Sequence, residues 1–145
     1  MIITVIRGLP GSGKSSYAHE LAKQTGAIVI EPDAFVTADG VYQYDAARWG
    51  KARMMSRSIM RMIASVQESD IIYADVCPTR QEVADMLRDI GQYAQELRFR
   101  VIDMPLLTLE ESRNRNRHNV RPGDLEQMVK SWEPWPKQTA EEPES

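Results

Sequence analysis

The 145-residue chain has a single cysteine, Cys77, so it cannot form an internal disulfide, and we expect it to occupy a reducing compartment. It has no apolar run of the ~18 residues that a membrane span needs. Its first residues, MIITVIRG, lack the basic segment and cleavage site of a signal peptide. Its formal net charge of −3 means that any nucleic acid would have to bind a local basic surface. These absences predict a soluble, cytoplasmic protein.

The length and composition predict one domain over residues 1–135. The hydrophobic share of 42% and the charged share of 27% are ordinary for a chain that buries a core. Residues 136–145, PKQTAEEPES, are acidic and contain proline, and we expect this tail to be disordered.

Short apolar runs alternate with segments of helical periodicity. Strands are expected at Ile2–Arg7, Ala27–Ile30, Ile71–Val76 and Phe99–Met104, and helices at 14–24, 45–68 and 80–96 and from about Thr108 and Asp124. The alternation predicts an α/β fold, in which a short, mostly parallel sheet of about four strands lies between helices. Ligands bind beyond the carboxyl ends of such strands, where Gly8, Asp33, Asp75 and Pro105 are expected to meet.

The segment RGLPGSGKSS matches the phosphate-binding pattern G-x-x-x-x-G-K-[ST]. It follows an expected strand and opens an expected helix, which is the context that this motif requires. Its glycines let backbone N–H groups turn toward phosphates, and the helix start adds a positive dipole. We expect Lys14 to reach the β- and γ-phosphates of a nucleotide and Ser15 to bind Mg²⁺. The whole predicted nucleotide cradle is Gly8, Pro10, Gly11, Ser12, Gly13, Lys14, Ser15 and Ser16.

Two aspartates are candidates for the chemistry at this edge. The base-reading N-K-x-D and switch D-x-x-G motifs of a GTPase are missing from the sequence, which favours phosphoryl transfer over a regulatory switch. Transfer to a hydroxyl needs a carboxylate on the acceptor side, and Asp33 is the candidate, although an aspartate after Pro32 also suits a turn. Asp75 follows an apolar run, where it could order Mg²⁺ or cap a turn.

A cluster of arginines is the candidate source of positive charge for the phosphates. In the segment RNRNRH, Arg113 and Arg117 share one face at helical spacing, whereas Arg115 points elsewhere. The segment leads into a proline-glycine turn. We interpret it as a lid that brings Arg113 and Arg117 over the nucleotide, the alternative being a solvated basic helix end.

With these pieces in this order, the chain resembles the P-loop polynucleotide kinase family over residues 2 to about 135. The resemblance rests on GLPGSGKSS, the Asp33 segment, the strand that ends at Asp75, Asp103-Met104-Pro105, and the lid from Arg113 to Val120. It implies a three-layer P-loop kinase fold with an arginine-bearing lid. It also implies that Lys14 and Ser15 hold ATP and Mg²⁺, that Asp33 accepts the proton of the acceptor hydroxyl, and that the lid arginines steady the phosphates.

The sequence departs from that family on the acceptor side. Many relatives have a second aspartate after the base, and the polynucleotide kinases have an arginine three positions after it; here these positions are Ala34 and Val36. The usual Asp-x-Thr-Asn reads Asp75-Val76-Cys77-Pro78. We therefore expect ATP-dependent transfer to a hydroxyl, with a nucleic acid 5′-hydroxyl as the leading acceptor and a hydroxyl on a modified DNA base as its nearest variant. A nucleoside or other small-molecule kinase and a non-catalytic ATP-binding regulatory module are the alternatives.

Two further features bear on the acceptor. Arg53, Arg57 and Arg61 fall at i, i+4 and i+8 of the long helix, either as a track for a nucleic acid backbone or as the solvent face of an amphipathic helix. In the second reading, Met55, Ile59, Met62, Ile63 and Val66 form the inner face. Trp132 and Trp135 would either stack a base or pin the C-terminal segment onto the domain.

Overall fold

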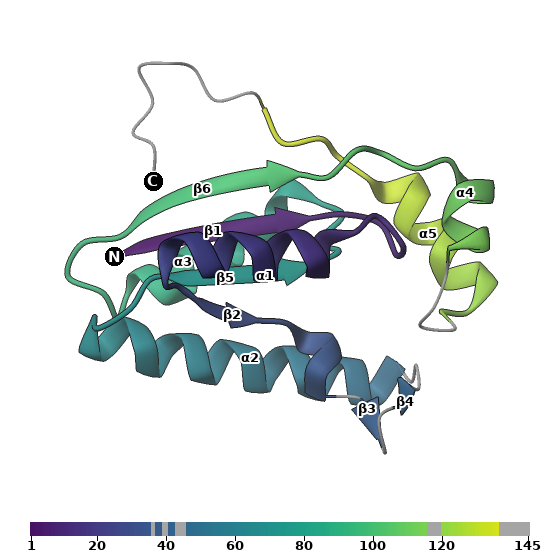
Figure 1. The fold of residues 1–145 in the computed structure, drawn as a ribbon. Coiled ribbons are helices and arrows are strands. Elements are labelled where there is room, and N and C mark those ends of the chain that lie inside the picture. The colour runs from purple at the N-terminus through teal and green to yellow at the C-terminus, as the bar shows by residue number, and fades with distance from the viewer. Residues whose placement is uncertain (36, 39–40, 43–45, 116–119, 137–145) are drawn as a thin grey trace.

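The computed structural model describes residues 1–35, 37–38, 41–42, 46–115 and 120–136. The strands and helices alternate as the sequence predicts (Figure 1). In chain order they are β1 (Ile2–Arg7), α1 (Lys14–Thr25), β2 (Ile28–Ile30), the 3₁₀ helix η1 (Pro32–Phe35), β3 (Thr37–Ala38), β4 (Val41–Tyr42), α2 (Ala46–Val66), β5 (Ile71–Asp75), α3 (Arg80–Gly91), β6 (Arg98–Asp103), α4 (Leu109–Asn114) and α5 (Pro122–Ser131).

The main sheet has four parallel strands in the order β2-β5-β1-β6, which confirms the predicted α/β fold. The central strand β1 pairs with β5 on one side and with β6 on the other. Its last residue, Arg7, is in register with Asp75 of β5 and with Asp103 of β6. The carboxyl ends of three strands therefore meet at one edge, where the chain leaves β1 for the glycine-rich loop. The short strands β3 and β4 form a separate antiparallel pair.

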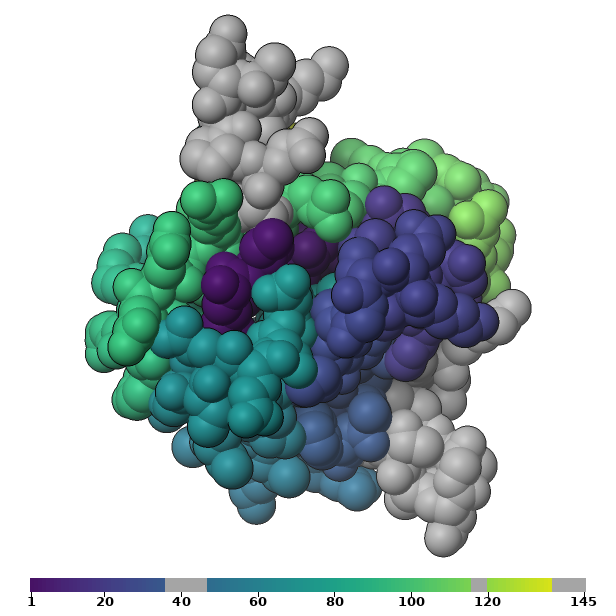
Figure 2. Space-filling view, turned by 60° about the vertical axis from the view of Figure 1, so that its left-hand side comes forward, coloured from purple at the N-terminus to yellow at the C-terminus, as the bar shows by residue number. Residues whose placement is uncertain are grey.

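Helices cover both faces of the sheet and make three layers. On one face, α1 packs through Ala18 over Ile6 and Ile72. On the other face, α2 and α3 cover a larger cluster to which Met60, Val83 and Ile90 contribute. The start of the chain, dark purple in Figure 2, lies between the blue of α1 and the green of β6. Because every central strand is buried on both faces, its residues form continuous apolar runs, as the sequence shows.

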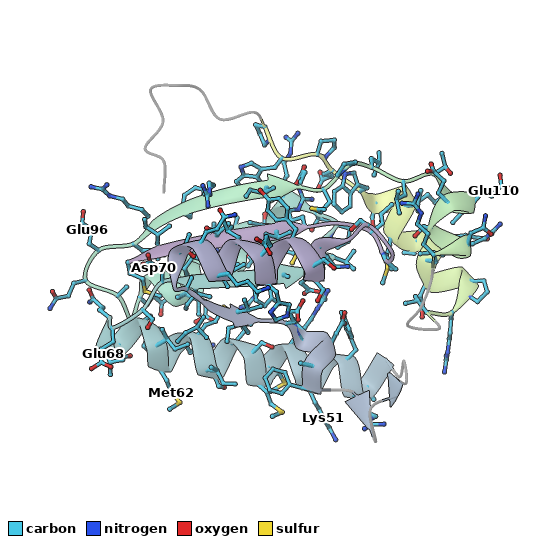
Figure 3. The ribbon with its side chains drawn as sticks, in the orientation of Figure 1. Lys51, Met62, Glu68, Asp70, Glu96 and Glu110 are labelled. Atoms are coloured by element: carbon cyan, nitrogen blue, oxygen red, sulfur yellow. The ribbon has the colours of Figure 1, made fainter. Side chains whose placement is uncertain are left out.

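The inner face of α2 differs from the sequence prediction. The residues that turn inward are small or flexible, namely Ala52, Ser56, Met60 and Ala64, and each is at most 1% exposed. Ile59 and Ile63 pack against the core as predicted, but Met55, Met62 and Val66 are more than half exposed, so the prediction that these three belong to the inner face is wrong. Figure 3 shows Met62 pointing away from the sheet. Helix α2 packs mainly against η1 and α3, and Met60 and Ala64 on its inner face belong to the core cluster.

The C-terminal segment is anchored across the edge of the sheet by Arg7, whose side chain is fully buried. The Arg7 guanidinium donates hydrogen bonds to the Cys77, Pro78 and Glu133 carbonyls, pairs with Asp103 at 2.8 Å, and lies 4.5 Å from the centre of the Trp132 ring. Trp135 packs edge-on against Phe99. In the structure, therefore, both tryptophans pin the C-terminal segment onto the domain. Among the described residues, no helix is both long and apolar enough to span a membrane.

Candidate active site

The glycine-rich loop connects β1 to α1 in the conformation that a phosphate cradle requires. Gly11 and Gly13 have φ of 84° and 86°, a region that side chains with a Cβ rarely adopt. The loop is closed by the Ser12 amide, which donates to the Leu9 carbonyl at 3.0 Å. The first turn of α1 has no acidic residue, and Gly13 provides no side-chain cap. Neither a carboxylate nor a cap therefore offsets the positive end of the helix dipole at this N-terminus.

A cavity of about 580 Å³ lies over this loop. From the loop and α1 it is lined by Gly11, Gly13, Lys14, Ser15 and Ser16, from the segment after β2 by Glu31 and Asp33, from β5 by Ala74, and from the end of α4 by Asn114 and Arg115. The size suits a nucleotide, since ligand pockets generally measure about 300–1,000 Å³. Position 8 of the loop has no room for a side chain, because a Cβ at Gly8 would overlap the Ser12 Oγ.

Lys14 is the charged group at the floor of this cavity and is only 8% exposed. Burial lowers the pKa of the Lys14 ammonium below its ordinary value, while the carboxylates of Asp33, Asp75 and Glu31 act in the opposite direction. A buried cation close to several carboxylates has little water to screen it. Lys14 is therefore well suited to bind a strongly anionic ligand, such as a triphosphate.

Asp33 and Glu31 line the same cavity as the glycine-rich loop. Asp33 is in the first turn of η1, which begins directly after β2 and packs against α2. The structure thus brings Lys14 and Asp33 to one cavity, as the strand-end argument predicts. Glu31 lines the same cavity and pairs with His19 of α1 at 3.2 Å, a contact that the sequence analysis does not anticipate.

Asp75 ends β5 as predicted, but its carboxylate is held by protein partners. It accepts hydrogen bonds from the Tyr73 hydroxyl at 2.9 Å and the Val76 amide at 2.8 Å, and the Arg53 Nε lies 3.0 Å away. The Cys77 thiol also donates to it. These contacts direct Asp75 toward the space between α2 and α3, while its neighbour Ala74 lines the phosphate cavity. A role for Asp75 in binding Mg²⁺ stays a prediction.

Of the predicted lid arginines, the structure describes Arg113 and Arg115, and their arrangement differs from the prediction. Helix α4 ends at Asn114. Arg113 points to α5, where its guanidinium pairs with Glu126 at 2.6 Å. Arg115, at the C-cap of α4, lines the phosphate cavity, and its backbone lies against Gly11. Arg117 lies outside the described residues.

Helix α4 is attached directly to the phosphate loop. The fully buried Ser112 donates from its hydroxyl to the Pro10 carbonyl at 2.9 Å. Thr108 and Glu111 form a reciprocal capping box that fixes the start of the helix. Because the two attachments position both ends of this short helix, Asn114 and Arg115 face the cavity. The capping box is visible in the sequence as Thr-x-x-Glu, whereas the contact with Pro10 has no local sequence signal.

The residues present fit ATP with Mg²⁺. Backbone amides at a helix start, a desolvated lysine and an arginine suit the phosphates, and the buried Ser12 Oγ has no hydrogen-bond partner among the described residues. Ser15 lines the cavity next to Lys14, where its hydroxyl can ligate a divalent cation. Among the described residues, no group of three or more histidine, cysteine or carboxylate side chains is placed to hold a metal ion.

Comparison with known families decides which family the chain belongs to. The family described as an AAA domain matches residues 3–133, nearly the whole chain. The chain belongs to this family. A search of curated proteins found no match to the domain.

The AAA domain has the fold of the P-loop kinases among solved structures. It is similar to a chain of the Pnkp1/Rnl/Hen1 RNA repair complex, with a TM-score of 0.65 and 18% identity, over 90% of the domain and 43% of that chain. It therefore spans less than half of that protein. It is also similar to a sugar kinase from Janibacter sp. HTCC2649 (TM-score 0.57, 22% identity, 98% and 82% coverage) and to the shikimate kinase of Acinetobacter baumannii (TM-score 0.50, 14% identity, 89% and 72% coverage).

Proposed function

We propose that the protein is an ATP-dependent phosphotransferase that moves the γ-phosphoryl group of ATP to a hydroxyl. The observation that carries the proposal is the common cavity lined by Lys14 of the phosphate loop and Asp33 of η1. A cation for the phosphates and a carboxylate for a hydroxyl proton are the two groups that this transfer needs. The fold supports the same reaction class, because the similar structures include sugar and shikimate kinases.

In this proposal each residue has one task. ATP supplies the phosphoryl group, and Ser15 would hold a Mg²⁺ ion, which would neutralise part of the phosphate charge. Lys14 and the loop amides bind the β- and γ-phosphates, and Arg115 covers them from the end of α4. Asp33 takes the proton of the acceptor hydroxyl while the oxygen bonds to the γ-phosphorus. The bond from that phosphorus to the β–γ bridging oxygen breaks, and ADP leaves with the electron pair.

For the acceptor, we propose a 5′-hydroxyl of nucleic acid or a hydroxyl on a modified DNA base. The similarity to a chain of an RNA repair complex supports this choice. A small-molecule acceptor is the second candidate, and one observation favours it. The arginines of α2, which could have tracked a polymer backbone, are engaged by Asp75 and Asp89.

The test is a transfer assay with γ-labelled ATP, Mg²⁺ and three acceptor sets: 5′-hydroxyl oligonucleotides, nucleosides and sugars. We expect label on one set, with loss of transfer in Lys14→Ala. Asp33→Asn should lower the turnover by about 10²–10⁴-fold, the usual contribution of a catalytic base. Glu20→Gln, which removes an exposed carboxylate from α1, is the control and should transfer normally. Full transfer by Asp33→Asn would rule out its role as the base.

The same assay separates the enzyme from a regulatory module. A module that only binds or hydrolyses ATP would release labelled inorganic phosphate at a rate independent of every acceptor. A kinase would label the acceptor at a rate that saturates with its concentration. ATP hydrolysis without acceptor labelling in all three sets would therefore contradict the proposed function.

A further inference from the structure

Helix α2 exposes an apolar face that has no role in the proposed site. The large side chains on this face are 51–71% exposed, namely Met54, Met55, Met62 and Val66. An open groove of about 520 Å³ lies along part of it, lined by Lys51, Met54, Met55, Ser58 and Ile59. Figure 3 shows Lys51 and Met62 pointing away from the sheet. The four large side chains expose on the order of 500 Å², and contiguous apolar patches of this size are often functional.

Residues on this face have the spacing of a helix–helix contact. Along α2 they alternate by four and three positions, as Lys51, Met55, Ser58, Met62 and Ser65. We call these five residues the outer strip. All five are exposed in the single chain. Residues that recur in this way lie along one narrow line of the helix surface, where they can meet a single neighbouring helix.

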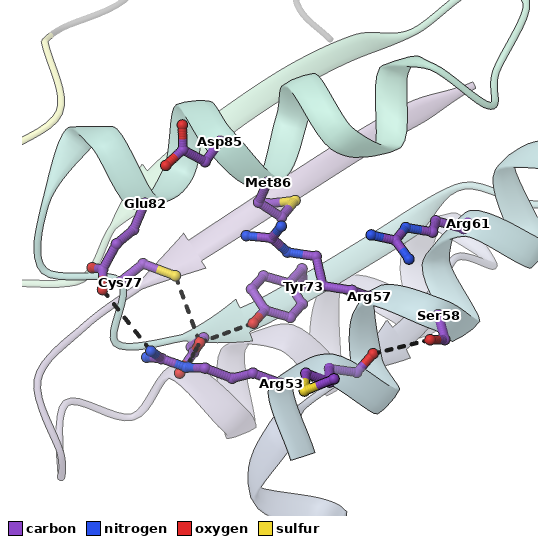
Figure 4. Close-up of a pocket in the computed structure, with 11 residues that line it drawn as sticks. Arg53, Arg57, Ser58, Arg61, Tyr73, Cys77, Glu82, Asp85 and Met86 are labelled. Atoms are coloured by element: carbon purple, nitrogen blue, oxygen red, sulfur yellow. Dashed lines mark hydrogen bonds and ion pairs between the residues drawn. The ribbon is translucent and has the colours of Figure 1, made fainter. Parts of the chain in front are cut away.

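The two serines of the outer strip do not need water. The Ser58 hydroxyl donates to the Met54 carbonyl at 3.1 Å, as a dashed line in Figure 4 shows. The Ser65 hydroxyl donates to the Arg61 carbonyl at 2.8 Å. Because each hydroxyl already has a partner within its own helix, its burial costs little. A neighbouring helix can therefore cover the centre of the outer strip without leaving these hydroxyls unpaired.

Three arginines of α2 lie on a different side of the helix. Figure 4 shows Arg53, Arg57 and Arg61 in the space between α2 and α3. Arg53 pairs there with Asp75, and the other two pair with Asp89 of α3. These arginines thus face the domain while the methionines face outward, which is the reverse of an ordinary surface helix. The composition of the outward side is that of a helix covered by another chain.

Opposite charges stand at the two ends of the outer strip. Lys51 lies near the start of α2, and Glu68 follows the end of the helix, at its far end in Figure 3. Both residues are exposed, and neither forms an ion pair within the described part of the chain. A strip with a cation at one end and an anion at the other is complementary to a copy of itself that runs in the opposite direction.

We propose that a second copy of this chain covers the outer strip, with the two α2 helices antiparallel and a twofold axis beside Ser58. Met55 then packs against the partner's Met62. With a rise of about 1.5 Å per residue, Lys51 and Val66 each lie about 11 Å from the axis, on opposite sides. Lys51 therefore reaches the last turn of the partner helix, where it meets the negative end of the helix dipole and the partner's Glu68.

A second copy fits better than an acidic helix from another protein. An acidic helix would pair with Lys51, but it would place like charges beside Glu68, whereas a second copy pairs both residues twice. The two copies would bury on the order of 1,000 Å² of apolar side chain, which is at the lower limit for a specific interface. We therefore expect a weak, reversible dimer, and its formation is independent of the proposed transfer reaction.

Sedimentation equilibrium over micromolar to low millimolar concentrations tests for this dimer. The weight-average mass of the wild-type chain should rise from 16.5 kDa toward twice that value. Met62→Glu, which introduces a charge into the outer strip at an exposed position, should stay at 16.5 kDa. Arg98→Gln, which changes an exposed arginine of β6, is the control and should associate as wild type does. A wild-type chain that stays monomeric, as it would if the face bound only a different protein, or normal association of Met62→Glu, would overturn the proposal.

A charge exchange tests the antiparallel arrangement. Lys51→Glu brings two carboxylates together at each end of the contact, so it should weaken association about tenfold. Glu68→Lys alone should have a similar effect, because it brings two ammonium groups together. The double variant Lys51→Glu/Glu68→Lys restores opposite charges and should recover most of the association. If the double variant associates no better than the single variants, the two copies do not pair in this direction, and the proposal is wrong.

Discussion

Replacing Arg7 by methionine should destabilise the fold severely, although Arg7 is not part of the phosphate cavity. Its side chain is fully buried at the end of β1, directly before the glycine-rich loop. It donates to the carbonyls of Cys77, Pro78 and Glu133 at 2.7–3.2 Å and pairs with Asp103 at 2.8 Å. Methionine has a similar length but donates no hydrogen bond, so the volume is largely kept while the polar contacts are lost.

The magnitude follows from what remains behind. The Asp103 carboxylate loses its cationic partner, although it still accepts from the Trp135 amide. Because the Asp103 side chain is about one-quarter exposed, losing its partner costs less than in a fully buried pair, but three carbonyls also lose a donor at about 1 kcal/mol or more each, for a total loss of about 3–5 kcal/mol. A domain of this size has a free energy of unfolding of about 5–15 kcal/mol. The substitution therefore removes a large fraction of the total stability.

Urea unfolding followed by tryptophan fluorescence measures this loss. With a slope of about 2 kcal/mol per molar urea, the midpoint should fall by roughly 1.5–2.5 M. Arg88→Met removes an exposed arginine from α3 and should change the free energy of unfolding by less than about 0.5 kcal/mol. Limited proteolysis of Arg7→Met should also cut near Trp132 first. If Arg7→Met and Arg88→Met unfold at the same urea concentration, our account of the C-terminal anchor is wrong.

Three further predictions concern single side chains. Burial and then the nearby Asp75 carboxylate raise the pKa of the Cys77 thiol well above its ordinary value. Iodoacetamide at pH 8 should therefore modify Cys77 only as fast as the protein unfolds. Rapid modification of the native protein would contradict the burial of this thiol. Hydrogen bonds from Arg61 lower the pKa of Asp89, so its contribution is present above about pH 4 and is lost as the pH falls through its folded pKa. Because both arginine partners are more than one-third exposed, Asp89→Asn should lower the free energy of unfolding by less than about 1 kcal/mol at pH 7 and by still less at pH 3, and an equal loss at both would refute the linkage. Gly11→Ala should weaken ATP binding at least tenfold, because the new Cβ would lie 2.8 Å from the Arg115 carbonyl oxygen. Gly26→Ala is the control, since Gly26 has a similar φ and free space around it. Equal ATP affinities of the two variants would contradict the predicted effect of Gly11→Ala.

The fold and the phosphate loop were predictable because their signals are local. The strand from Ile2 to Arg7, the glycine pattern and the helix from Lys14 follow one another without interruption, and each fixes the next. The strand ends also predicted that Asp33 and Lys14 would lie at the same edge of the sheet, and both line one cavity.

The inner face of α2 and the lid arginine were not predictable in this way. The face of α2 depends on its packing against η1 and α3, including Asp89 of α3, which pairs with Arg57 and Arg61. The orientation of Arg115 depends on where α4 ends. These are contacts between segments far apart in the sequence, and helical periodicity carries no information about them.

The most direct test of the account is transfer of labelled phosphate from ATP to a hydroxyl acceptor by the wild-type protein and by two variants. The account predicts acceptor labelling by wild type and none by Lys14→Ala. It predicts that Asp33→Asn still binds ATP with near-normal affinity but transfers at least a hundredfold more slowly. Undiminished labelling by Lys14→Ala, or by Asp33→Asn, would contradict the assignment of this cavity as a phosphotransferase site.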